Sequence, residues 1–158
     1  MFAFRVKPIP VAIAEKTRQT GKSPQYGHPV FTEIAKGYGP CRQCLHTFRT
    51  GEESRTLFTY NPFDGLDDYP SPGPIFIHDK PCTPFAADGF PEDLRSIPLV
   101  LEAYGKDRQL IAQERIHDGV VEPGIEKLLA LDGVLYLHVR NLEAGCFIAQ
   151  VDKVNREG

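Results

Sequence analysis

The chain has 158 residues, enough for one domain with a hydrophobic core, and 41% of them are hydrophobic. A net charge of −3 argues against a nucleic-acid partner, and the longest basic patch, Lys16, Arg18 and Lys22, stands beside Glu15. The sequence contains neither a membrane-length apolar run nor the pattern of a signal peptide. We therefore expect a cytoplasmic protein with reduced cysteines and no membrane partner, whose oligomeric state the sequence does not reveal.

The first half of the chain predicts short strands, one helix and long loops. Alternating apolar residues predict a strand at 2–6, and apolar spacing predicts a helix at 11–19. Further strands are expected at 55–60 and 75–78. The segment 61–74 between them holds four prolines, so it cannot form regular structure. Because it carries apolar anchors at Phe63, Leu66 and Tyr69, we expect it to pack over the sheet.

The C-terminal third predicts four strands and one helix. The helix spans about residues 123–131, with Pro123 in its first turn and Ile125, Leu128 and Leu129 on one face. The predicted strands are 99–104, 109–116, 134–140 and 146–152. This order predicts an α+β fold: a single domain over residues 1–158, with a mostly antiparallel sheet, the helix packed on one face and long Pro/Gly-rich loops.

Four metal-ligating side chains form two pairs in the sequence. Cys41 and Cys44 make a Cys-x-x-Cys turn after Gly39-Pro40, and His78 and Cys82 follow the proline-rich loop. Together they would complete a tetrahedral zinc site, with His46 as a rival ligand. The His-x-x-x-Cys spacing is not a standard second pair, so buried or surface thiols are the favoured interpretation and no cofactor is predicted. Redox exchange would need the Cys-x-x-Cys turn between a strand and a helix, a context that the sequence does not predict.

The last predicted hairpin gathers polar groups on one face. Side chains alternate along a strand, so Leu137 and Val139 face the helix while Tyr136, His138 and Arg140 face the other way. A symmetric hairpin would place Arg140 beside Cys146, with Phe147 on the helix side. An arginine fork and an imidazole suit a carboxylate or phosphate ligand, although a half-solvated sheet face explains the same pattern.

Several blocks resemble a bacterial family catalogued as a domain of unknown function, number 1203. They are Gly39-Pro40-Cys41-Arg42, Thr59-Tyr60-Asn61-Pro62, Gly73-Pro74-Ile75-Phe76-Ile77-His78, Tyr136-Leu137-His138-Val139-Arg140-Asn141 and Gly145-Cys146-Phe147-Ile148-Ala149-Gln150-Val151-Asp152. The family has no established activity, so the resemblance implies a class of protein and no mechanism. Its pattern includes counterparts of Arg42, His138, Asn141 and Cys146 but does not require Cys44 and His78, which would make zinc a feature of a subgroup.

The sequence thus leaves three functions open. The favoured hypothesis is a small anionic ligand at the polar face of the C-terminal hairpin, bound by Arg42, His138, Arg140, Asn141 and Cys146. The alternatives are a structural zinc module, using Cys41, Cys44, His78 and Cys82, and an interaction domain without chemistry. Whether the protein is an enzyme is not decided by any of these patterns.

Overall fold

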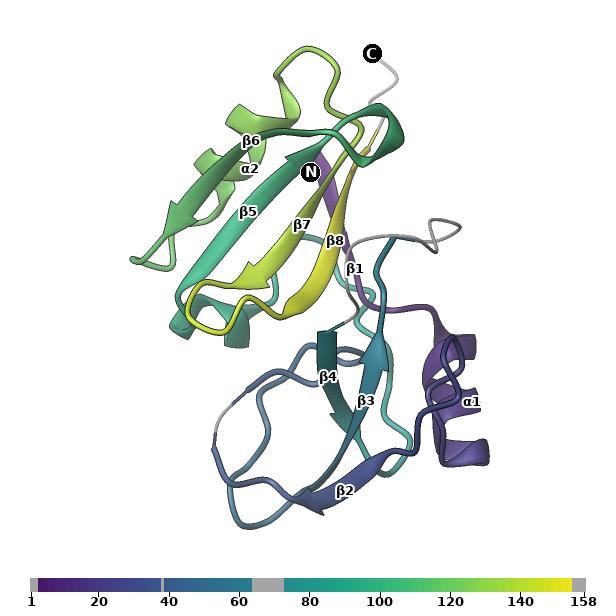
Figure 1. Cartoon of the computed structure of the whole chain (residues 1–158). Helices are drawn as coiled ribbons and strands as arrows, with labels where there is room; N and C mark the ends of the chain where they lie inside the picture. The colour runs from purple at the N-terminus through teal and green to yellow at the C-terminus, as the bar shows by residue number, and fades with distance from the viewer. Residues whose placement is uncertain (1–2, 38, 64–72, 155–158) are drawn as a thin grey trace. The chain divides into compact units, whose positions relative to one another are not determined.

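The computed structural model describes residues 3–37, 39–63 and 73–154, and the chain forms two compact units (Figure 1). The first unit comprises residues 1–7 and 86–158, and the second comprises residues 8–85. The described residues contain two helices and eight strands in two antiparallel sheets, which confirms the predicted α+β class. The single domain over 1–158 stays a prediction, because the division into units does not test it.

The second unit consists of one helix and a three-stranded sheet with the strand order β2-β3-β4. Its elements are α1 (Val11–Thr20), β2 (Phe31–Ile34), β3 (Ser54–Tyr60) and β4 (Gly73–His78). Strand β2 was not among the predicted elements. Its Phe31 and Ile34 are 57% and 50% exposed, so the strand shows no alternation between a buried and a solvated face.

The first unit contains a five-stranded sheet with the order β1-β8-β7-β5-β6. Its strands are β1 (Phe4–Lys7), β5 (Leu99–Tyr104), β6 (Leu110–Ile116), β7 (Tyr136–Asn141) and β8 (Phe147–Lys153). Its helices are α2 (Glu122–Leu129) and two short 3-10 turns, η1 (Glu92–Ser96) and η2 (Lys106–Arg108). Helix α2 packs against β5, β6 and β7 through the predicted face, where Ile125, Leu128 and Leu129 are buried. Strand β1 forms one edge of the sheet, where it pairs with β8.

Helix α2 lies very close to the sheet because of Gly124. A Cβ atom at this position would stand 3.2 Å from Ile116 Cδ1 and 3.3 Å from Leu101 Cδ1. These contacts are tighter than ordinary van der Waals packing, so a larger residue would push the helix away from the core. The helix predicted on one face of the sheet is thus present, and Gly124 lies where it comes very close to the strands.

The register of the last hairpin differs from the symmetric one that the sequence suggested. Val139 pairs with Ala149, but Arg140 pairs with Phe147, because a bulge leaves Ile148 without a partner position in the ladder. The extra residue moves Phe147 to the side of His138, whose ring centroid lies 4.9 Å from that of Phe147. The prediction that Phe147 faces the helix, and that Cys146 lies opposite Arg140, was therefore wrong.

Most of the proline-rich segment lies outside the described residues. Phe63, its first predicted anchor, is buried, whereas residues 64–72, including Leu66 and Tyr69, are not described. The packing of this loop over the sheet thus stays a prediction. Neither helix in the described ranges is long and apolar enough to span a bilayer.

An ion pair at the start of α2 makes the stability of the first unit depend on pH in the acidic range. The Arg95 guanidinium donates to both carboxylate oxygens of Glu122, with Nη1 2.8 Å from Oε1, and also to Gly119 O. Hydrogen bonding from Arg95 lowers the pKa of Glu122 from 4.5 to about 2. A lowered carboxyl pKa stabilises the fold above the unfolded value, and this contribution disappears as the pH falls from 4.5 towards 2.

We therefore expect Glu122→Gln to cost about 1 kcal/mol at pH 7 and almost nothing near pH 2. Urea unfolding of the variant and the unchanged protein at both pH values measures this difference. A difference that is the same at pH 7 and pH 2 would show that Glu122 acts through packing and not through its charge.

Candidate metal centre

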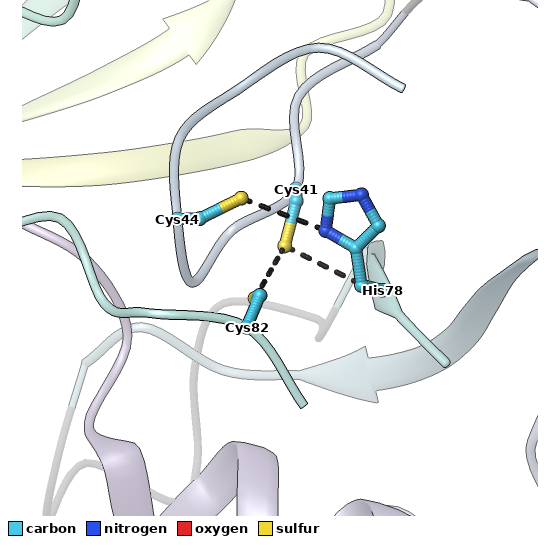
Figure 2. A group of neighbouring side chains, drawn as sticks. All are labelled: Cys41, Cys44, His78 and Cys82. Carbon is cyan, nitrogen blue, oxygen red and sulfur yellow. Dashed lines mark hydrogen bonds between the residues drawn. The ribbon is translucent and has the colours of Figure 1, made fainter. Parts of the chain in front are cut away.

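Cys41 and Cys44 lie in a tight turn that backbone hydrogen bonds hold closed. Leu45 N–H donates to Cys41 O and Cys41 N–H donates to His46 O, each at 2.9 Å. Leu45 has a φ of 61°, a left-handed conformation that is uncommon for leucine, and its side chain is only 1% exposed. The buried side chain and the backbone bonds together hold this strained turn, which presents both thiols to the same space (Figure 2).

Two backbone hydrogen bonds bring His78 and Cys82 to this turn. Arg42 N–H donates to Phe76 O at 3.0 Å, which docks the turn onto β4 two residues before His78. Phe85 N–H donates to Gln43 O at 2.9 Å, which returns the segment after Cys82 to the same turn. Of the second ligand pair, His78 therefore lies at the end of a strand and Cys82 in the irregular segment that follows. This explains why the two residues do not have the spacing of a standard Cys-x-x-Cys turn.

The four predicted ligands converge in one cluster (Figure 2). The three Sγ atoms and one ring nitrogen of His78 all lie within 4.8 Å of one another. Cys41 Sγ is 3.7 Å from Cys82 Sγ, and Cys44 Sγ is 3.5 Å from His78 Nδ1. Around a tetrahedral zinc ion, two sulfurs stand about 3.8 Å apart, and a sulfur and a nitrogen about 3.5 Å apart. The residues thus fit such an ion, since no separation in the cluster exceeds these spacings by more than about 1 Å. His46, the rival ligand, is exposed and is not one of the four.

Hydrogen bonds inside the cluster already divide the charge unevenly between the thiols. The bond with Cys44, followed by that with Cys82, lowers the pKa of Cys41, whereas the same bond with Cys41 raises the pKa of Cys44. Bonding to Cys41 raises the pKa of His78 to about 10. One thiolate beside an imidazolium is therefore favoured and further thiolates are resisted. A divalent cation would supply the positive charge that three thiolates need.

Backbone amides and one arginine surround the sulfur atoms. Cys41 Sγ accepts hydrogen bonds from Gln43 N–H at 3.4 Å and from His78 N–H at 3.3 Å. Arg18, in the last turn of α1, donates from Nε to His78 O at 3.1 Å and from Nη2 to Cys82 Sγ at 3.8 Å. These donors stabilise negative charge on sulfur, and Arg18 places a cation beside a cluster that would be anionic with zinc bound.

A carboxylate contacts the far side of the His78 ring. His78 Nε2 is 3.0 Å from Glu53 Oε2, and Arg49 N–H donates to Glu53 Oε1 at 2.7 Å. Glu53 has a lowered pKa, first because of the Arg49 backbone bond, so it is ionised near neutral pH. Sequence reasoning missed both Arg18 and Glu53. Arg18 had been assigned to a diluted basic patch, and no local pattern distinguishes Glu53 from Glu52.

His138 is completely buried on the polar face of the C-terminal hairpin. Its ring centroid lies 5.0 Å from that of Tyr104 and 5.2 Å from that of Tyr136. Burial lowers the pKa of His138 to about 3, so the ring is neutral at pH 7. The face is thus covered at this point, and its imidazole does not supply the positive charge that would attract an anion.

The other residues predicted to bind an anion have partners within their own units. Arg140 Nε lies 2.6 Å from Glu102 Oε1, and Asn141 Oδ1 accepts from Glu143 N–H and Ala144 N–H, which shapes the hairpin turn. Cys146 is half-buried just before β8. Arg42 belongs to the second unit, where its buried Nη1 donates to Pro40 O at 2.8 Å. The anionic ligand stays a prediction that none of these contacts tests.

A family model described as "Protein of unknown function (DUF1203)" matches residues 38–153. The matched range contains Cys41, Cys44, His78 and Cys82, whereas Arg18 lies before it. No curated protein and no solved structure matches the chain.

Proposed function

We propose that this chain, which belongs to the DUF1203 family of unknown function, binds one zinc ion through Cys41, Cys44, His78 and Cys82, and that the ion is structural. The observation that carries the proposal is the convergence of four ligand atoms within 4.8 Å from the turn, the end of β4 and the segment after it. Such convergence needs the tertiary fold, since His78 follows Cys44 by 34 residues.

The donor set favours zinc over harder cations. Three sulfurs and an imidazole nitrogen are soft or borderline ligands, which select zinc, copper(I) or iron–sulfur clusters and not magnesium or calcium. Four protein ligands fill a tetrahedral shell, so no position stays open for a substrate or a water. The ion would then link three segments of the second unit. Thiolate ligands also require reduced cysteines, and we accordingly propose a reducing compartment such as the cytoplasm.

Elemental analysis of the purified protein tests this proposal. We expect about one zinc per chain, and iron well below that amount. Cys44→Ser and Cys82→Ser should each lose most of the metal, while Cys146→Ser, a change to a half-buried thiol in the other unit, should keep it. Metal-free protein after expression with added zinc, or full zinc content in the Cys44→Ser/Cys82→Ser double variant, would refute the centre.

A further inference from the structure

The His78 ring presents two different nitrogens to two different neighbours. Nδ1 faces the cluster, 3.5 Å from Cys44 Sγ, while Nε2 faces Glu53 Oε2 at 3.0 Å. A neutral imidazole has one N–H donor and one lone pair, and only the lone pair can bind a metal. The identity of the ligand atom thus depends on which nitrogen carries the proton.

Glu53 decides this choice, because an ionised carboxylate can only accept. When a metal ion replaces the proton on Nδ1, the nitrogen that faces the thiols, this carboxylate would hold the remaining proton on Nε2. Metal-bound histidines generally donate their other ring N–H to such a partner, which also makes the ring a stronger donor to the metal.

The carboxylate and the ring are themselves held in place. Glu53 Oε1 accepts from Arg49 N–H at 2.7 Å, and Arg49 Nε lies 3.7 Å from the same oxygen. The Phe48 ring, 3% exposed, meets the His78 ring edge to face, with centroids 4.7 Å apart and planes 64° apart. The turn from Phe48 to Glu53 thus fixes the imidazole at two points. The Phe48 ring packs against the His78 ring, and the Glu53 carboxylate contacts Nε2.

We propose that Glu53 is a positioning residue of the metal centre: it fixes the Nε2–H tautomer of His78 so that the ion is bound through Nδ1. This inference rests on the proposed zinc site, since the orientation of His78 matters to function only if the ring is a ligand. Glu53 meets the cluster at the His78 ring, so its effect passes through that residue.

Substitutions in the zinc-loaded full chain test the role of Glu53, with the neighbouring exposed glutamate as control. Glu53→Ala removes the acceptor, Glu53→Gln keeps a neutral acceptor oxygen, and Glu52→Ala makes the same truncation one residue away. In competition with a chelator we expect zinc to bind about tenfold more weakly to Glu53→Ala, with Glu53→Gln intermediate and Glu52→Ala unchanged. Nitrogen-15 NMR of the histidine rings should show metal-bound Nδ1 and protonated Nε2 in the unchanged protein.

The possible results separate this inference from the zinc site itself. Equal zinc affinity in Glu53→Ala and Glu52→Ala, or coordination through Nε2 in the unchanged protein, would overturn the role of Glu53 and leave the centre intact. Unchanged protein that binds no zinc would overturn both. If Glu53→Ala fails to fold, the ring spectrum of the unchanged zinc-loaded protein still decides the question, since a proton on Nδ1 in that state contradicts the proposal.

Discussion

Removal of zinc is expected to destabilise the second unit by at least about 4 kcal/mol, measured against protein at a free zinc concentration of a thousand times the dissociation constant. The reason is that the proposed ion would bind the folded arrangement of three segments, which the unfolded chain does not preserve, so its binding energy would add to folding stability. Urea unfolding of the full chain, with zinc and with excess chelator, measures the effect.

Amide hydrogen exchange locates this loss of stability. When zinc is chelated, the protection of backbone amides against exchange should decrease mainly within residues 8–85, around the cysteine turn and β4. The control variant Cys146→Ser should respond to the chelator as the unchanged protein does. Unfolding curves that coincide with and without zinc would contradict a structural role. Loss of stability confined to residues 86–154 would place the effect outside the proposed centre.

Replacement of Arg140 by methionine is expected to cost about 2 to 3 kcal/mol, because it leaves the Glu102 carboxylate unpaired in a mostly buried position. Both side chains of this pair are 18% exposed, and Tyr104 OH donates to the same carboxylate oxygen at 2.9 Å. Adding Glu102→Gln to the Arg140 variant should restore much of the loss, since the remaining amide carries no charge. Denaturant unfolding of the single and double variants measures the coupling.

An exposed ion pair in the same unit is the control for Arg140. Arg5 and Asp88 lie 3.1 Å apart, with side chains 47% and 74% exposed, so Arg5→Met should cost no more than about 0.5 kcal/mol. Equal costs for the two arginine variants would contradict the buried-pair interpretation.

The same proteins test the predicted anionic ligand. Stabilisation of the unchanged protein by phosphate that Arg140→Met abolishes would support the ligand, whereas identical stability with and without phosphate would contradict it.

The sequence predicted most strands and both helices from the spacing of their apolar residues, which is clearest in α2, where Ile125, Leu128 and Leu129 are all buried. Helix α2 was expected at 123–131 and spans Glu122–Leu129, and β5 has the predicted bounds. Strand β2 was missed because its large apolar residues face solvent. The bulge in β8 was also missed: apolar residues continue on both sides of it, and an extra residue in one strand is visible only when the partner strand is known.

The candidate site was predictable only as a set of ligands. The four residues could be named because cysteine and histidine are rare and chemically distinct, but their convergence depends on the bonds that dock the turn onto β4. The residues that support them gave no signal, since Arg18 and Glu53 lie 60 and 25 positions from His78 in the chain. A carboxylate and a guanidinium become recognisable as part of a metal site only when the fold has placed them there.

The pairing of β1 with β8 has a consequence for the order in which the protein assembles on the ribosome. Phe4 pairs with Lys153, so the sheet of the first unit cannot be completed until translation has passed residue 153. All of residues 8–85, including the last cysteine of the cluster, are synthesised long before that point. We expect the unit with the proposed metal centre to fold first, whereas the four residues of β1 can pair only after β8 has been synthesised.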